Sequence, residues 1–121
     1  MTMVPKSLFE VAHFFSQGEK FQLCLGNFLD WFKSNGTFEA LSEEPMPQNF
    51  EIEVFLAATA AQLAKDNGWK TPEWANHPEK VIEPPRFPTN NKQYREELLK
   101  ECPEEFKRRG LIISANALSR C

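Results

Sequence analysis

One amphipathic stretch, residues 50–67, constrains the fold of this chain more than any other part of its sequence. Apolar and small residues recur in it three and four positions apart, whereas its charged residues fall elsewhere on the helical wheel. The run from Ala57 to Ala61 favours a helix and lets neighbouring helices approach closely, and Asn67–Gly68 is a pair typical of a helix C-terminus. We therefore predict a central core helix over Phe50–Asn67, whose buried face comprises Ile52, Phe55, Leu56, Thr59, Ala60, Leu63 and Ala64.

Helical spacing with cap residues also marks the stretches on either side of this helix. Ser7 and Glu10 have the spacing of a capping box at the start of a helix. Asn35–Gly36 is a stop signal of the same kind as Asn67–Gly68. The predicted helices are Ser7–Gln17, Glu19–Ser34 and Asn91–Glu101, with shorter ones at Phe38–Glu43 and Pro103–Arg109.

Residues 68–90 differ in composition from the rest, because they hold five prolines together with Trp69, Trp74 and Phe87. We predict that they form a rigid, ordered wrap over the helical core. Farther along, Leu111–Ile113 is the only strand-like run, and it is too short to make a sheet alone. The sequence therefore predicts a mainly α fold, a single-domain helical bundle over residues 1–121. Its expected parts are an N-terminal helix (1–18), a helical core (19–67), the wrap (68–90) and C-terminal helices (91–121).

Composition excludes several classes of function. The net charge is −3 with acidic and basic residues interspersed, so direct binding to nucleic acid or to a charged membrane surface is not expected. No window approaches the roughly 18 apolar residues needed to span a bilayer. Cys24, Cys102 and Cys121 are scattered and lack metal-ligand spacing, so we expect reduced thiols, a cytoplasmic protein, no metal and no cofactor.

Six motifs follow one another from Phe21 onward, and their order resembles that of a known group of proteins. They are FxxCLxxFLDxF (Phe21–Phe32), ALSEEP (Ala40–Pro45), an Ala-rich helix (Phe50–Ala64), GxxxPxWA (Gly68–Ala75), EPPRFP (Glu83–Pro88) and PEEFKRRGLIISANALSR (Pro103–Arg120). The group comprises small bacterial helical proteins and the C-terminal domain of some helix-turn-helix regulators. The resemblance implies an α-helical domain with a regulatory or antitoxin-like role and no catalytic residues. The sequence before Phe21 is too short for a separate DNA-reading domain.

Two sets of residues are candidates for contact with a partner. The cations Lys107, Arg108, Arg109 and Arg120 are expected at the surface, where they form a contact patch or a solvated helix C-terminus favoured by the helix dipole. The aromatic residues Trp69, Trp74 and Phe87 form either a recognition surface or a seal over the core. We expect the second role for Trp69 and Trp74, because burying rigid aromatic side chains is favourable.

Residues with catalytic side chains form no recognisable constellation. His13 and His77 can each serve as a general base in principle, but neither has a nucleophile and an orienting group at a suitable spacing. The carboxylates Glu43, Glu44, Glu51 and Glu53 gather around the start of the central helix, where solvation and the helix dipole account for them. We therefore predict a non-enzymatic protein-interaction module, and leave a homodimer open. The alternatives are a small enzyme using His77 or the acidic cluster, and a ligand-sensing or DNA-associated regulatory domain.

Overall fold

A computed structural model describes residues 4–45, 49–76, 81–82 and 91–113 of the chain, and these residues are mainly helical. The helices are α1 (Leu8–Ser16), α2 (Phe21–Asn35), α3 (Glu39–Ser42), α4 (Phe50–Asp66), the 3-10 helix η1 (Glu73–Asn76), α5 (Lys92–Glu101) and α6 (Glu104–Arg108). The predicted mainly α fold is confirmed. The strand-like run is not a strand, since only Leu111 of residues 111–113 takes part in a single β-bridge.

Side-chain caps fix the starts of three of these helices. Ser7 accepts a hydrogen bond from the backbone N–H of Glu10 (3.1 Å), as the capping box predicts, while the Glu10 carboxylate reaches back to the N–H of Lys6 (3.0 Å). Asn49 caps α4 and Asn91 caps α5 in the same way, each through a bond of 3.0 Å to an N–H three residues later. These helices therefore begin where a short polar side chain accepts a hydrogen bond from a backbone N–H group of the first turn.

The two glycines predicted to stop helices act by different means. Gly68 has φ +72°, the left-handed conformation expected after α4. Gly36 has φ −64°, so α2 ends at the predicted position without a left-handed residue. A Cβ at Gly36 would lie 2.6 Å from the ring and the carbonyl of Phe32, so glycine is needed there for close approach.

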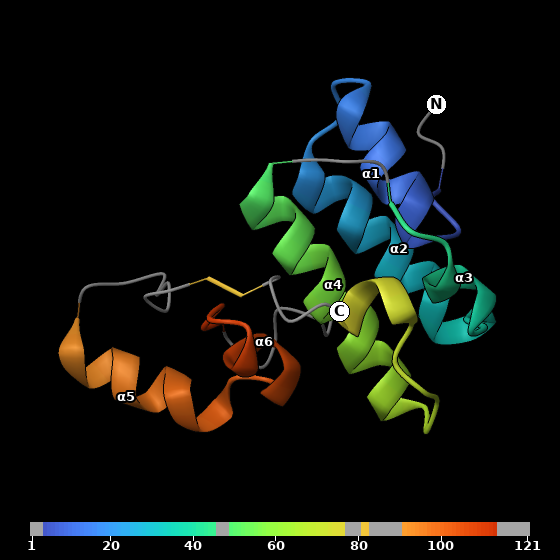
Figure 1. Cartoon of the computed structure of the whole chain (residues 1–121). Coiled ribbons are helices and arrows are strands. Elements are labelled where there is room, and N and C mark those ends of the chain that lie inside the picture. The colour runs from blue at the N-terminus through green and yellow to red at the C-terminus, as the bar shows by residue number, and fades with distance from the viewer. Residues whose placement is uncertain (1–3, 46–48, 77–80, 83–90, 114–121) are drawn as a thin grey trace.

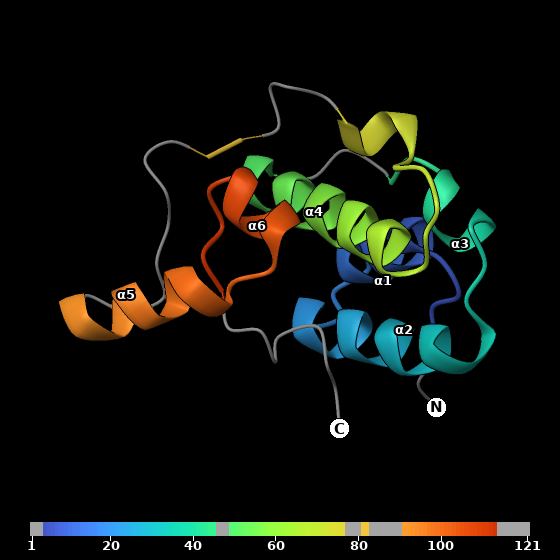
Figure 2. The same cartoon turned by 90° about the horizontal axis from the view of Figure 1, so that it is seen from below.

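Helix α4 lies at the centre of the molecule, with α1 and α2 on one side of it and α6 on another (Figures 1 and 2). A first apolar cluster joins α4 to α1, α2, α3 and η1, and includes Phe28, Leu56 and Trp74. A second joins the other side of α4 to α5, α6 and residues 111–112, and includes Val54 and Phe106. Residues 54–61 are therefore buried on both sides of α4, apart from the half-buried Phe55, rather than on the single face that periodicity predicts.

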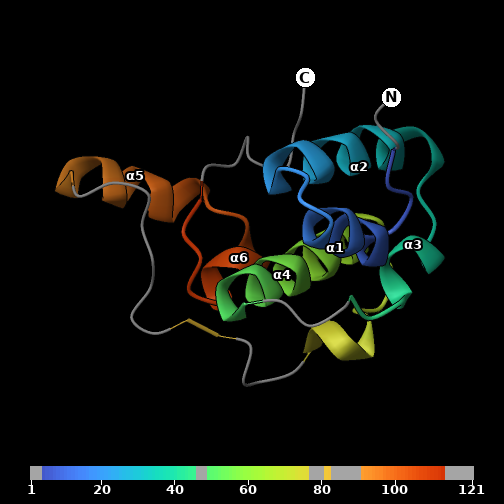
Figure 3. The same ribbon diagram turned by 90° about the horizontal axis from the view of Figure 1, so that it is seen from above.

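A row of four aromatic rings crosses the two clusters. Phe15 of α1 packs edge-on against Phe21 of α2 with ring centroids 5.5 Å apart, and Phe21 packs against Phe55 of α4 at the same distance. Phe55 in turn meets Phe106 of α6 at 5.1 Å. Edge-to-face pairs of this kind contribute about 0.5–1.5 kcal/mol each beyond the free energy gained by burying the rings. The row therefore links α1, α2, α4 and α6. Helix α5 projects away from this body (Figure 3).

Candidate functional site

The predicted basic patch does not form as a unit. Lys107 and Arg108 are exposed at the end of α6, whereas Arg109 is only 3% exposed. The prediction that Arg109 lies at the surface is therefore wrong. Arg120, the fourth cation of the predicted patch, lies outside the described residues.

Arg109 is buried because the fold supplies partners for its guanidinium group. Its Nη1 donates to the carboxylate Oε1 of Glu105 (2.7 Å) and to the carbonyl oxygen of the same residue (3.0 Å). Its Nη2 donates to the carbonyl oxygen of Ala75 in η1 (2.9 Å). A guanidinium with a buried carboxylate and two carbonyls around it can leave water, so Arg109 joins η1 to α6 instead of meeting a partner.

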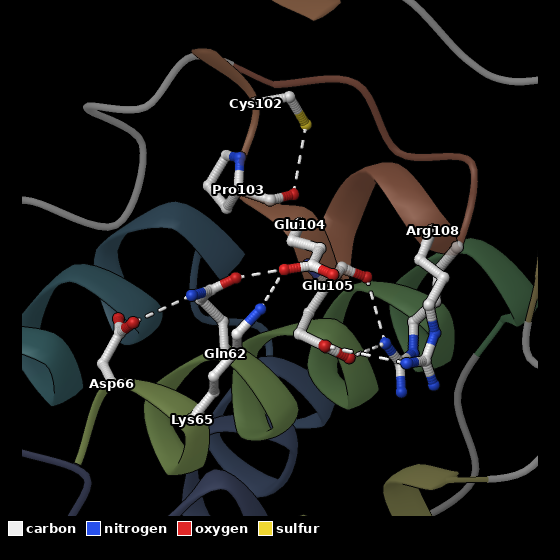
Figure 4. A network of polar contacts seen from close by, with 9 residues as sticks. Gln62, Lys65, Asp66, Cys102, Pro103, Glu104, Glu105 and Arg108 are labelled. Carbon is white, nitrogen blue, oxygen red and sulfur yellow. Dashed lines mark hydrogen bonds and ion pairs between the residues drawn. The ribbon is translucent and has the colours of Figure 1, made fainter. Parts of the chain in front are cut away.

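Polar contacts also connect α4 to α6, as Figure 4 shows. Lys65 forms an ion pair with Glu104, and Gln62 accepts a hydrogen bond from the backbone N–H of Glu105 (3.3 Å). The hydrogen bond from Lys65 lowers the pKa of Glu104, and the pKa of Lys65 is raised by the same contact. Both side chains are exposed, so the pair contributes little to stability and is screened by salt. This surface of α6 is occupied by intramolecular contacts.

Of the aromatic residues of the wrap, Trp74 lies in the core and Trp69 lies at the edge of the core. Trp74 is 6% exposed, and its indole N–H donates to the carbonyl oxygen of Leu41 (2.8 Å), which ties η1 to α3. Trp69 is half-buried and packs edge-on against Phe32 and Phe38. Residues 68–76 of the wrap thus cover the core. Phe87 lies outside the described residues.

The residues considered for catalysis are not assembled into a site. Glu43, Glu44 and Glu51 are exposed and Glu53 is half-buried, and across residues 4–45, 49–76, 81–82 and 91–113 no three His, Cys, Asp or Glu side chains are placed to hold a metal ion. His13 packs against the ring of Phe14, with centroids 5.9 Å apart. His77 lies outside the described residues, so the structure leaves its proposed role open.

Two cysteines are buried free thiols with structural contacts. Burial raises the pKa of the Cys102 thiol, whose Sγ accepts a hydrogen bond from the N–H of Ile113 (3.4 Å) and lies 3.4 Å from the carbonyl oxygen of Leu111. Burial and then the charge of Glu19 raise the pKa of Cys24. A thiol kept protonated is a poor nucleophile and a poor metal ligand, so neither cysteine is a reactive centre.

The feature that sequence reasoning missed is an apolar groove beside α2 and α4. It has a volume of about 490 Å³ and its apolar lining comprises Phe21, Leu25 and Leu29 of α2, Ile52 and Phe55 of α4, and Ile113. Phe21, Leu25 and Leu29 recur every four residues, so they lie in one row along α2; Phe21 is half-buried, whereas Leu25 and Leu29 are buried in the core. Phe21 and Phe55 also belong to the aromatic row, where their rings pack edge-on against each other in the groove lining.

The polar residues that line this groove are Gln22 and Glu51, and both are exposed. Gly26 of α2, which has no side chain, also lines the groove. Sites for small polar molecules usually gather several convergent polar groups, and the described residues of this lining do not. An apolar row between two helices is typical of grooves that take a helix or an extended peptide. The helical spacing of α2 was visible in the sequence, but which of its apolar residues border a groove was not.

Comparison of the chain with protein-family models, with curated proteins and with solved structures gives no match. In the described ranges, which leave out 46–48, 77–80 and 83–90 among others, no helix has the length and apolar character needed to cross a bilayer.

Proposed function

We propose that this protein is a non-enzymatic interaction module that binds a segment of another protein in the groove beside α2 and α4. The observation that carries the proposal is the apolar lining of about 490 Å³ formed by residues of two helices and Ile113. Burying apolar surface contributes roughly 25 cal/mol per Å². Leu25 and Leu29 are already buried, so the gain on binding comes from covering the half-buried side chains Phe21, Ile52, Phe55 and Ile113. The role of a regulatory or antitoxin-like partner subunit, which the resemblance implies, belongs to the same proposal.

A cytoplasmic location is part of this proposal. Cys24 and Cys102 are free and buried, and both keep their thiols protonated. Disulfides are rare where glutathione and thioredoxin keep thiols reduced, and free thiols are the usual state there. A reducing compartment therefore suits this chain.

The proposal is tested by blocking the groove from its rim. Gln22 lines the groove and is exposed, so Gln22→Trp places a large side chain over it with little expected effect on folding. Ser34→Trp is the matched control, because Ser34 is exposed on the same helix and does not line the groove. Binding partners are first captured from the native host with tagged wild-type protein and identified by mass spectrometry. The purified partner is then titrated against each variant.

We expect Gln22→Trp to lower the affinity for the captured partner about tenfold or more, equivalent to about 1.4 kcal/mol of binding free energy. Ser34→Trp should bind the partner with the affinity of the wild type. Arg108→Glu is measured alongside, because Arg108, like Lys107, is an exposed cation at the end of α6. Loss of binding in Arg108→Glu together with full binding in Gln22→Trp would assign the contact to α6 and refute the groove.

A further inference from the structure

Ile113 forms a wall of the groove that α2 and α4 do not supply. Of the described residues that line the groove, Ile113 alone lies outside these two helices. Its side chain is half-buried and packs against the second apolar cluster, as that of Phe55 does. The position of this wall therefore depends on how residues 110–113 are held against α5 and α6.

Two hydrogen bonds hold residues 110–113, and the second of them lies at the groove. The backbone N–H of Leu111 donates to the carbonyl oxygen of Phe106 (2.9 Å). The backbone N–H of Ile113 donates instead to a side chain, the Sγ of Cys102 (3.4 Å). The sulfur thus closes the loop 102–113, which contains α6, at the residue that forms the groove wall.

The Cys102 thiol is placed to accept and to donate a hydrogen bond at the same time. Its S–H has two carbonyl oxygens within reach, that of Leu111 at 3.4 Å and that of Pro103 at 3.5 Å, the second of which Figure 4 shows. Cys102 is 8% exposed and is the C-cap of α5, where its backbone N–H donates to the carbonyl oxygen of Leu98 (2.8 Å). Burial raises the pKa of the thiol, so the proton needed for donation is kept. The sulfur is therefore a fixed point to which Ile113 is attached.

We propose that Cys102 is a positioning residue of the groove, whose sulfur keeps Ile113 in the wall and thereby sets the affinity for the partner segment. This inference rests on the proposed function and adds a determinant of affinity to it. Without the sulfur contact, a partner must itself order Ile113 when it binds, and ordering a side chain at an interface lowers affinity. Sulfur is a weak hydrogen-bond acceptor, so its loss should change the affinity several-fold rather than abolish binding.

Substitutions that separate the hydrogen bonds of the thiol from its volume test the inference. Cys102→Val fills a similar volume but cannot accept or donate, whereas the hydroxyl of Cys102→Ser can do both. Cys24→Val is the matched control, because Cys24 is a buried thiol of the first cluster and is not among the described residues that line the groove. Amide hydrogen exchange of Ile113 and Leu111 is measured by NMR in each full-length variant. The purified partner captured with the wild-type protein is then titrated against all of them.

We expect the Ile113 amide to exchange about three- to tenfold faster in Cys102→Val than in Cys24→Val, because it has lost its acceptor. The Leu111 amide, which donates to Phe106, should exchange at similar rates in the two variants. The affinity of Cys102→Val for the partner should fall about two- to tenfold. Cys102→Ser and Cys24→Val should bind within about twofold of the wild type.

Several results would overturn the inference while leaving the groove as a site. They are an unchanged Ile113 exchange rate in Cys102→Val, a rate that rises equally at Leu111, and faster exchange at Ile113 without loss of affinity. An equal loss of affinity in Cys102→Ser and Cys102→Val also counts against it, since the hydroxyl retains the hydrogen bonds. If Cys102→Val does not fold, Cys102→Ala replaces it in the same comparison. Full binding of the partner by Gln22→Trp is a different failure, because it rejects the groove and the proposed function together.

Discussion

Arg109 provides a sharp test of how α6 is held. In Arg109→Met the carboxylate of Glu105, whose side chain is 10% exposed, loses its partner at 2.7 Å, and the Ala75 carbonyl loses its donor. Breaking a buried ion pair from one side costs about 3–5 kcal/mol. Nη1 of Arg108 lies 3.8 Å from the second Glu105 oxygen and offers some compensation, so we expect about 3 kcal/mol.

This loss corresponds to a large shift of the melting temperature. Unfolding entropies of about 2.1 cal/mol/K per residue give a Tm lower by about 12 °C for a chain of 121 residues. Thermal unfolding followed by circular dichroism measures it, with Arg108→Met as the control because Arg108 is exposed. The double variant Arg109→Met/Glu105→Met should recover part of the loss, because no buried charge is left unpaired. A shift of less than about 4 °C in Arg109→Met, or a double variant less stable than the single one, would refute the reasoning.

Three further predictions concern the wrap and its neighbours. Trp74→Ala should cost about 3–5 kcal/mol in urea unfolding, as aromatic truncations in cores do, and a midpoint equal to that of the parent would place Trp74 outside the core. Gly110→Ala should lower the free energy of unfolding more than Gly68→Ala does in the same assay. Both glycines have positive φ, but only at Gly110 would a Cβ lie 2.0 Å from the carbonyl oxygen of Ile82. Equal losses of stability in the two variants would contradict this. Burial raises the pKa of Cys102, so its contribution to stability is fully present below the unfolded thiol pKa of about 8.5 and is lost as pH rises through the folded value. The wild type should therefore lose more stability than Cys102→Ala between pH 8 and about 10, and parallel pH curves would show that the thiol is not perturbed.

Local patterns predicted the helices well because helix formation depends on nearby residues. The apolar period and the caps of α1, α4 and α5 lie within the segments concerned, so Ser7 and the start of α5 at Asn91 were predicted from residue type and position, whereas Asn49, the cap of α4, was not predicted. The left-handed Gly68 followed from the same reasoning. At Gly36 the deciding contact is the ring of Phe32, which propensity alone does not reveal.

The site could be predicted only in part, because burial depends on contacts between distant segments. Arg109 sits in a run of three cations, and nothing in that run shows that the Ala75 carbonyl will lie 2.9 Å from its guanidinium group. The groove has the same origin. Phe21 and Ile52 have the pattern of core residues, and Ile113 comes from a segment far along the chain. Which apolar residues stay uncovered becomes known only when all the helices are placed.

The central claim is that the groove beside α2 and α4 binds a partner segment. Amide chemical shifts of isotopically labelled protein, recorded during titration with the captured partner, test it most directly. The account predicts that the largest shifts lie at residues 21–29 and 51–55 and at Ile113, with small ones at Lys107 and Arg108. Shifts confined to Lys107, Arg108 and their neighbours on α6, with the groove residues unchanged, would contradict it.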